Sequence, residues 1–444
     1  MNDDAAWSPV EVTVPRCFGP LPQTFFVSAA QPAVIPICDN AEFKGNGPGF
    51  DYAISVTRVG STAPNLHVVF KGTEVKGSYD DAFLVIPKPQ LGTSYWTMGY
   101  RGGSPQQGSR WSAVATAPLT LSYSNCADVA TGQGLGANGV FQQICFSTSP
   151  PNNKKEEEAT GFQISSTNNQ PFALISGATC AVVPYPSAPC ETLLEMIPPK
   201  EWAGNEYLVT EFNKAGNPDF PGDLVRIMAL DLDASVTVTE ATNPQGRINV
   251  DFTGDAYACI NYSPAGFNIP AGTFCDLHIE GGARVHSGTG PILVGHFMKS
   301  FSQAKTGDAS FALVTPTSRF SCGHRFYSFE GYPYDPNPPP PPPTNIGTLN
   351  GTYVNIVAPT GAIDTILLDG LALTAAASAC LDYARHDYGP GSNYSWAKCR
   401  LADPPTGGEQ HVIQSLYVGD ERITAYAYGQ ATAAAYSYPT GYSF

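Results

Sequence analysis

The sequence predicts an all-β protein of tandem antiparallel, sandwich-like domains, with a separate β module after a proline-rich spacer. Three observations support this fold class. Glycine and proline are abundant, at 44 and 40 of 444 residues, while charged residues make up only 14% of the chain. Short apolar runs rich in Val, Thr, Tyr and Phe alternate with these turn formers, as strands joined by loops do. A pattern that recurs after about 110 residues indicates duplicated domains rather than a solenoid.

The region 288–320 contains the clearest strands. Residues 291–298 form an apolar run interrupted only by Gly295 and His296, and residues 311–314 resume it after a polar loop. Runs this short, with Gly and Pro around them, favour core strands over helices. Further strands are predicted at 25–27, 34–37, 50–59, 67–70, 353–357, 365–368, 412–416 and 423–428.

Two segments carry more specific local signals. Residues 248–253 alternate strictly, which places Val250 and Phe252 toward a core and the residues between them toward water. Residues 191–197, ETLLEMI, are the one convincing helical fragment, about two turns long.

The internal repeat is carried by proline, glycine and aromatic residues at fixed spacings. Each copy begins at a Pro-Lys pair and is interpreted as turn, strand, loop, strand and strand. The copies comprise Pro87, Gly92, Tyr95 and Tyr100, followed by Leu119-Thr-Leu, and Pro199, Gly204, Tyr207 and Phe212, followed by Val236-Thr-Val.

The run 335–344, DPNPPPPPPT, is the plainest boundary in the chain. Its six consecutive prolines cannot donate ladder hydrogen bonds and favour polyproline II, so we interpret it as a stiff spacer. The predicted organisation is a first β domain at 1–125, a second with insertions at 126–334, the linker at 335–344 and a C-terminal β-sandwich module at 345–444.

Composition and cysteine usage favour an extracellular protein. Eleven cysteines without a C-x-x-C pair favour disulfides, and a cytosolic protein with reduced thiols is the alternative. Sequons at Asn261, Asn350 and Asn393 agree with an exported glycoprotein. The net charge of −15 argues against nucleic acid and anionic membrane surfaces as partners, and no membrane span is visible.

Proximity along the chain suggests how the cysteines pair. Cys380 and Cys399 are the only cysteines after the proline run, so we expect them to form a disulfide. The other expected pairs are Cys17–Cys38, Cys126–Cys145, Cys180–Cys190 and Cys259–Cys275. Because the total is odd, this assignment leaves Cys322 free.

Four stretches carry a family resemblance. They are PILVGHF with GDASFALVTPTSRF at 291–320, LGTSYWTMGY at 91–100, the segment 205–240, and the chain end AYAYGQATAAAYSYPTGYSF. Together they resemble the amino-terminal domain family of IgG Fc-binding protein. The resemblance implies a secreted, all-β, non-enzymatic module of the kind found in mucus-type and adhesive proteins. It does not imply that this chain binds immunoglobulin.

Patterns that could support chemistry are sparse. Residues 134–139 satisfy G-x-G-x-x-G, but they lack the preceding strand and following helix that dinucleotide binding needs, so we interpret them as a loop. His278, His286 and His296 could meet on neighbouring strands as metal ligands or a base. No G-x-S-x-G or H-E-x-x-H motif accompanies them, which favours structural histidines.

Carboxylates gather in two places. Asp219 and Asp223 offer the oxygen ligands that calcium prefers, although their spacing matches no calcium motif and a solvated turn is the simpler interpretation. Asp231 and Asp233 alternate on one face of a predicted strand. No other cofactor is indicated.

The chain end suggests a contact surface. Tyr426 and Tyr428 share one strand face, as do Tyr436 and Tyr438, and the small residues between the two pairs could turn a hairpin. The rings either fill a core or form an exposed aromatic shelf for a glycan or a neighbouring copy.

The sequence therefore predicts a secreted, non-enzymatic binding or structural protein of the adhesive, matrix or mucus type. Its expected partners are an extracellular protein, a glycan or copies of itself. A carbohydrate-binding protein is the alternative, and a hydrolase on a β scaffold ranks last because no nucleophile motif is present.

Overall fold

The computed structural model describes residues 8–19, 21–27, 33, 35–37, 47–49, 53–59, 67–73, 80–102, 108–124, 129–145, 158–185, 190–212, 222–241, 247–249, 257–300, 308–329, 351–389, 391–402, 404, 408–416, 422–431 and 434–443. These residues form antiparallel β-sheets, several 3₁₀ turns and one short helix, α1 (Pro15–Phe18). The all-β class predicted from the sequence is confirmed.

Most strands belong to three pairs of sheets, which we call sheet pairs 1, 2 and 3; each joins a four-stranded and a five-stranded sheet. Sheet pair 1 comprises β3 (Gly47–Gly49), β7 (Ser94–Trp96), β8 (Ser109–Ala115), β9 (Leu119–Ser124), β10 (Val129–Leu135), β11 (Val140–Cys145), β12 (Gln163–Ser166), β13 (Phe172–Ala181) and β14 (Glu191–Ile197). Sheet pair 2 comprises β15 (Glu206–Val209), β16 (Asp223–Ala229), β17 (Ala234–Glu240), β18 (Arg247–Asn249), β19 (Phe267–Ile269), β20 (Phe274–Glu280), β21 (Ala283–Ser287), β22 (Ile292–Met298) and β23 (Ser310–Leu313). Sheet pair 3 comprises β24 (Gly323–Ser328), β25 (Gly351–Pro359), β26 (Ile366–Leu368), β27 (Leu371–Ala372), β28 (Cys380–Asp387), β29 (Tyr394–Leu401), β30 (Glu409–Ser415), β31 (Thr424–Ala431) and β32 (Ala434–Pro439).

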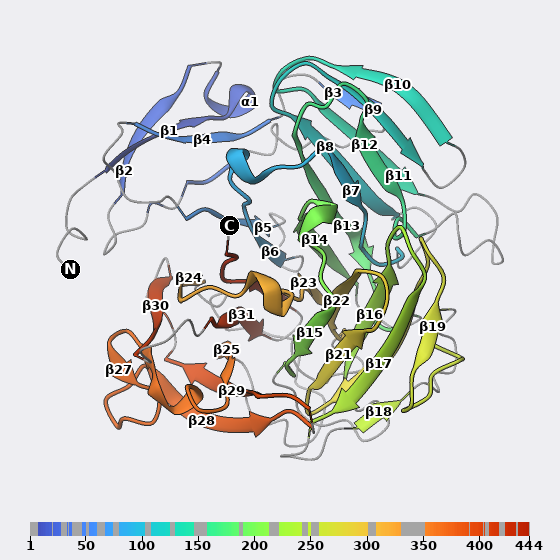
Figure 1. Ribbon diagram of the computed structural model, residues 1–444. Helices are drawn as coiled ribbons and strands as arrows, with labels where there is room; N and C mark the ends of the chain where they lie inside the picture. Colours follow the sequence, from blue (N-terminus) through green and yellow to red (C-terminus); the bar gives the residue numbers. More distant parts are fainter. Residues whose placement is uncertain are drawn as a thin grey trace, which may run out of the picture.

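The three sheet pairs share one spatial order of strands, although the edge strands β3, β18 and β28 enter at different points of the chain. The four-stranded sheets have the orders β10-β9-β12-β7, β19-β17-β21-β15 and β27-β26-β30-β24, and the five-stranded sheets β3-β11-β8-β13-β14, β18-β20-β16-β22-β23 and β28-β29-β25-β31-β32. Ahead of them lie the sheet of β1 (Ser8–Thr13), β2 (Gln23–Val27) and β4 (Ser55–Arg58), and the hairpin of β5 (Val69–Thr73) and β6 (Asp80–Leu84). Figure 1 shows these parts arranged around the carboxyl end of the chain.

The predicted repeat is visible as one hydrogen-bond pattern. The hydroxyl of Tyr95 accepts a hydrogen bond from the backbone N–H of Gly92 at 2.8 Å and donates to the carbonyl of Phe172. Tyr207, Gly204 and Ile292 repeat both bonds in sheet pair 2. In sheet pair 3, Nε2 of His324 keeps the contact with the Ile423 carbonyl at 2.9 Å, while the N–H of Ser321 donates to that carbonyl instead of to the side chain. The repeat therefore has a third copy, which begins at Pro316 and keeps the same spacings.

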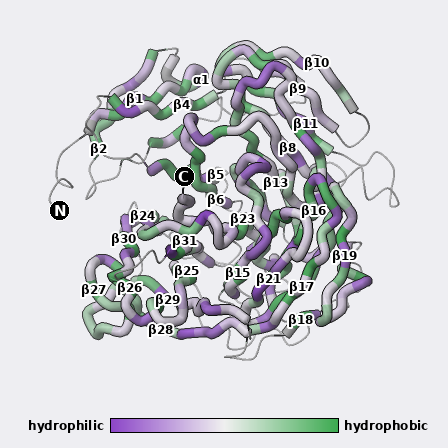
Figure 2. The backbone as a smooth tube through the Cα atoms, in the orientation of Figure 1, coloured by the Kyte–Doolittle hydropathy of each residue, from purple (hydrophilic) through white to green (hydrophobic). Residues whose placement is uncertain are grey.

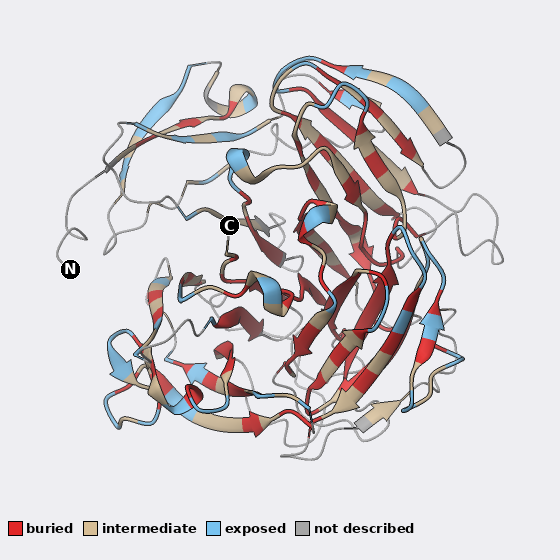
Figure 3. Ribbon diagram, viewed as in Figure 1, coloured by how far each residue is buried: buried red, intermediate tan, exposed pale blue. Residues whose placement is uncertain are grey.

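Four inner strands meet at the centre of this arrangement. β6, β14, β23 and β32 pack in a closed ring, because β6 contacts β14 and β32 while β23 contacts the same two strands. We call this the axis. Figure 3 shows that β6, β14 and β23 are largely buried, and the described side chains of β32 are buried as well.

The Asp81 carboxylate ties the axis together. It is fully buried and accepts backbone N–H groups from all four inner strands: Ala82 at 2.9 Å, Leu194 at 2.9 Å, Phe311 at 3.3 Å and Ser437 at 3.4 Å. Burial raises its pKa well above the usual range, and these N–H groups act in the opposite direction.

Glu195 forms a second level of the axis. It is also fully buried and accepts the N–H groups of Met196 and Leu313, both at 3.0 Å. Burial likewise raises the pKa of the Glu195 carboxyl. Strands of different sheet pairs are therefore joined through side-chain carboxylates where no backbone ladder connects them.

The predicted core strand at 291–298 is confirmed by β22, which is buried along its whole length. Its two faces pack in different cores: Leu293 and Phe297 join the core of sheet pair 1, while Ile292 and Val294 join that of sheet pair 2. A strand covered on both faces gives a continuous apolar run, and Figure 2 shows apolar residues in every sheet pair.

A buried ion pair network joins sheet pairs 1 and 2. Arg226 on β16 is fully buried and holds Asp276 through two bonds of 2.8 Å and Glu158 through one of 2.9 Å. It also donates to the carbonyl of Gly99, just after β7. At the equivalent place between sheet pairs 2 and 3, Asn355 donates to the carbonyl of Glu211.

The prediction of a separate C-terminal module is not supported. β24 lies before the proline run, yet it pairs with β30 after the run, from Gly323 opposite Gln414 to Ser328 opposite Glu409. Val357, Trp396 and Tyr426 also pack in the core of sheet pair 2. The proline run lies outside the described residues.

The predicted helix at 191–197 is wrong. This segment is β14, paired with β13 from Leu174 opposite Ile197 onward. Alternation explains the difference, because Glu191, Leu193 and Glu195 point to one fully buried face. Val250 and Phe252, predicted to face a core, lie outside the described residues.

Three predicted disulfides are confirmed: Cys180–Cys190, Cys259–Cys275 and Cys380–Cys399. Cys17 and Cys145 are also disulfide-bonded, but their expected partners, Cys38 and Cys126, lie outside the described residues. Cys322 is exposed and free, as predicted.

Candidate functional site

The four tyrosines proposed as an exposed shelf are core residues, so that prediction is wrong. Tyr428 and Tyr438 are fully buried, and Tyr426 and Tyr436 are 2% and 6% exposed. Burial raises the pKa of Tyr426 to about 12. The hairpin itself is real, but Tyr438 stands opposite Ala427, so the two tyrosine pairs point to opposite faces and fill different cores.

The proposed calcium ligands are only partly described. Asp219 lies outside the described residues. Asp223 is buried, accepts the backbone N–H of Phe212 at 2.8 Å and lies 2.9 Å from Nε2 of His296. Within the described ranges, no group of three or more His, Cys, Asp or Glu residues could hold a metal ion.

One cluster has the connectivity of a Ser-His-Asp triad. In sheet pair 3, His411 Nε2 lies 3.1 Å from the hydroxyl of Ser328, and His411 Nδ1 lies 2.7 Å from Asp369. The accessibility is the reverse of what nucleophilic catalysis needs, because Ser328 is fully buried and Asp369 faces solvent. The Ser328 hydroxyl donates to the carbonyl of Glu409, so the cluster links β24 to β30.

The G-x-G-x-x-G segment covers the end of β10 and the turn that connects β10 to β11 in the other sheet of sheet pair 1. The turn after Leu135 agrees with the interpretation as a loop, but a strand does precede the motif, which the sequence interpretation missed. Asn138 adopts a positive φ of 61° there, and its N–H donates to the carbonyl of Ala115 at 2.8 Å. No helix follows, so the segment lacks the helix N-terminus that holds a pyrophosphate.

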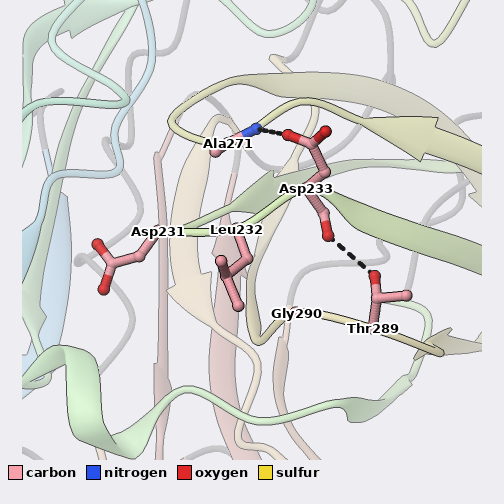
Figure 4. A pocket seen from close by; sticks show the side chains of 6 residues that line it. All are labelled: Asp231, Leu232, Asp233, Ala271, Thr289 and Gly290. Atoms are coloured by element: carbon pink, nitrogen blue, oxygen red, sulfur yellow. Dashed lines mark hydrogen bonds between the residues drawn. The ribbon is translucent and has the colours of Figure 1, made fainter.

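A surface pocket lies at one end of sheet pair 2, where three turns meet (Figure 4). The turns connect β16 to β17, β19 to β20 and β21 to β22. The pocket is lined by Asp231, Leu232, Asp233, Ala271, Thr289 and Gly290, and we call these six residues the Leu232 surface. Asp231 and Asp233 were predicted on a strand face, but they occupy the first of these turns instead.

Leu232 is the apolar feature of this surface, because 61% of it is exposed. The two neighbouring carboxylates point to opposite sides of the turn (Figure 4). Asp233 accepts the N–H of Ala271 at 2.8 Å, and its carbonyl accepts the hydroxyl of Thr289 at 2.9 Å.

Asp231 connects the Leu232 surface to sheet pair 1. One carboxylate oxygen accepts the indole N–H of Trp96 on β7, and the other accepts Nζ of Lys200, both at 3.1 Å. Lys200 lies in the 3₁₀ turn η3 (Lys200–Trp202). The surface is therefore supported by two neighbouring sheet pairs.

Sequence reasoning did not find this surface. The local signal is the tripeptide Asp231-Leu232-Asp233 between two apolar strands, which indicates a turn carrying a single large apolar side chain. A single exposed leucine is normal on protein surfaces, so the tripeptide alone does not indicate a binding site. The structure adds that two other turns lie beside it.

The fold and its disulfides define a class of repeated, disulfide-bonded β proteins. The family described as IgGFc binding protein matches residues 81–429, which is more than half of the chain. The chain belongs to this family, as its resemblance suggested. No curated protein and no solved structure matches it.

Proposed function

We propose that the chain is an exported binding module of the adhesive, matrix or mucus type that holds an extracellular protein and catalyses no reaction. The observation that carries this proposal is the family match, which begins at Asp81 on the axis and covers the strands of all three sheet pairs except β3 and β32. The family name refers to immunoglobulin Fc. For this chain, Fc is one of several proteins whose binding should be tested.

The use of reactive side chains supports a role without catalysis. Buried groups of catalytic type, such as the Ser328–His411–Asp369 cluster and the Asp223–His296 pair, connect strands inside the protein. The Leu232 surface offers no nucleophile beside a base among its lining residues.

Two features support an extracellular location. Three disulfides are formed between described cysteines, and such bonds persist in oxidising compartments. The sequon residues Asn261 and Asn393 are exposed, where glycans would project into solvent, while Asn350 lies outside the described residues. No helix of the described residues is long and apolar enough to cross a membrane.

Binding measurements test this proposal. The purified chain is immobilised and exposed separately to immunoglobulin Fc, to a panel of extracellular matrix and mucus proteins, to a glycan array and to the chain itself. We expect saturable binding in a protein arm. Binding confined to the glycan array would favour the carbohydrate-binding alternative. Absence of binding to every tested protein, glycan and copy of the chain would contradict the proposal.

A separate assay tests the absence of catalysis. Ester, peptide and glycoside substrates are incubated with the chain and with its Ser328→Ala variant. We expect no turnover by either protein. Turnover that Ser328→Ala abolishes would instead assign a hydrolase to the buried triad.

A further inference from the structure

We propose that the Leu232 surface docks a protein segment that presents an apolar side chain next to a lysine or arginine. This proposal rests on the proposed binding function and names the place and chemistry of the contact. The expected occupant is a cationic and apolar protein segment, and three properties of the surface favour it.

The first property is rigidity. Thr289 links two of the turns, because its hydroxyl accepts the N–H of Ser235 at 2.9 Å and donates to the Asp233 carbonyl. The third turn is fixed by Gly272, whose N–H donates to the carbonyl of Leu230 at 2.8 Å. A surface already ordered before binding loses little conformational entropy when a partner docks.

The second property is the exposed Leu232 side chain beside a shallow pocket. Leu232 projects from the turn, and Ala271 and Gly290 beside it are small. A Cβ on Gly290 would lie 3.0 Å from the Cβ of Leu232, so a larger residue at this position would displace the leucine. The small neighbours leave the exposed Leu232 side chain accessible to one apolar side chain of a partner.

The third property is charge. Lys200 pairs with Asp231, whereas Asp233 accepts a backbone N–H and has no ion-pair partner among the residues that the structure describes. Glu201, next to Lys200, is exposed as well, and the whole chain has a net charge of −15. A cation on the partner complements this field, and charge complementarity raises association rates and specificity.

The same lining argues against a sugar. Among the six residues of the Leu232 surface, none has an aromatic ring on which a sugar could stack. Trp96, just outside it, lies so near Gly272 that a Cβ added there would come within 3.2 Å of the ring, and its indole N–H donates to Asp231. Its hydrogen-bond donor is therefore already used.

Two immobilised peptide arrays test the proposal. Both consist of 12-residue peptides with one apolar residue; in the first it is flanked by Lys or Arg, and in the second by Glu at the same positions. We expect the chain to bind peptides of the first array only. We also expect binding to weaken at least tenfold between 50 mM and 500 mM salt, because exposed charges are screened.

Variants then locate the contact. Leu232→Ala and Asp233→Asn should each weaken binding by about fivefold or more. The matched controls are Leu381→Ala and Asp382→Asn, which alter an exposed leucine (55%) and its neighbouring carboxylate on β28. They should leave binding within about twofold of the unmodified chain.

The outcomes separate the two proposals. Binding that survives both Leu232→Ala and Asp233→Asn contradicts this surface but leaves the binding function intact. Preference for the Glu array contradicts the charge argument. If neither array binds while Fc or a matrix protein does, a linear cationic segment is not the partner. If no arm of any binding measurement gives a signal, the proposed function fails as well.

Discussion

The axis and the Leu232 surface use carboxylates in opposite ways. At the axis, Asp81 and Glu195 are fully buried and accept only backbone N–H groups. At the Leu232 surface, Asp231 and Asp233 are exposed at a turn, and Asp233 has no ion-pair partner in the described part of the chain. Removing a buried carboxylate leaves several N–H donors without an acceptor. Removing an exposed carboxylate allows its former donors to bind water instead.

This difference separates stability from recognition. The axis joins strands that come from β6 and from all three sheet pairs, so changes there should unfold the protein. The Leu232 surface lies on turns already closed by their own hydrogen bonds, so changes there should affect binding alone.

Asp81→Asn should cost about 4 kcal/mol of unfolding free energy. All four partners of Asp81 are donors, so the amide group of Asn would face donors with its own N–H₂. Urea unfolding measures the loss. Asp382→Asn, an exposed carboxylate on β28, is the control and should stay within about 0.5 kcal/mol. Equal unfolding free energies for the two variants would contradict the structural role of the buried Asp81 carboxylate.

Removing the Cys380–Cys399 disulfide with paired alanines should cost about 3 kcal/mol. The bridge joins β28 to β29 at the outer edge of sheet pair 3, away from the axis. Thermal unfolding followed by circular dichroism measures the change. Complete loss of structure would show that the axis does not hold sheet pair 3 without this bridge.

His324→Gln should flatten the dependence of stability on pH. Burial of His324 lowers its pKa to about 4, while the unfolded chain has the ordinary value near 6.5. Its contribution is therefore complete above about pH 6.5 and is lost as the pH falls toward about 4, on the order of 2 kcal/mol. Unfolding in urea at pH 7 and at pH 4.5 measures the difference between the chain and the variant.

Asp81 and Glu195 act with the opposite sign, because their pKa values are raised. The stability that they contribute is present at acid pH and declines as the pH rises through the values of the folded state. The His324 comparison must therefore be made between variants at the same pH. Parallel pH profiles for the chain and His324→Gln would contradict the burial argument.

Leu232→Ala should change the unfolding free energy by less than about 0.5 kcal/mol, since most of the side chain is exposed. The same urea titration measures it. A loss of 2 kcal/mol or more would show that Leu232 belongs to a core, and the proposed docking surface would then lose its apolar contact.

The sequence predicted the strands and disulfides best where the signal is local. β22 was evident because both its faces are covered, and Cys259–Cys275 because few residues separate the two cysteines. The third copy of the repeat was missed because Ser321 and His324 replace the Gly and Tyr of the other copies. The contact of the side chain with the facing carbonyl, His324 with Ile423, is kept even though the residue types are not.

The errors concern relations between distant residues. The tyrosines at the chain end look like one shelf, but the register of β31 and β32 turns the two pairs to opposite faces. The apolar spacing of Leu193, Leu194 and Ile197 looks helical, while pairing with β13 makes the segment a strand. The Leu232 surface could not be predicted, because its three turns meet only in the folded chain.

The closed arrangement around the axis is the central claim, and cleavage at the proline run tests it most directly. A protease site replaces residues 338–343, and the cleaved protein is examined by size-exclusion chromatography without denaturant. Because β24 pairs with β30 and β32 packs against β6 and β23, we expect the two pieces to elute together and to separate only in urea. Separation into a folded fragment 345–444 and a folded remainder under native conditions would contradict this account.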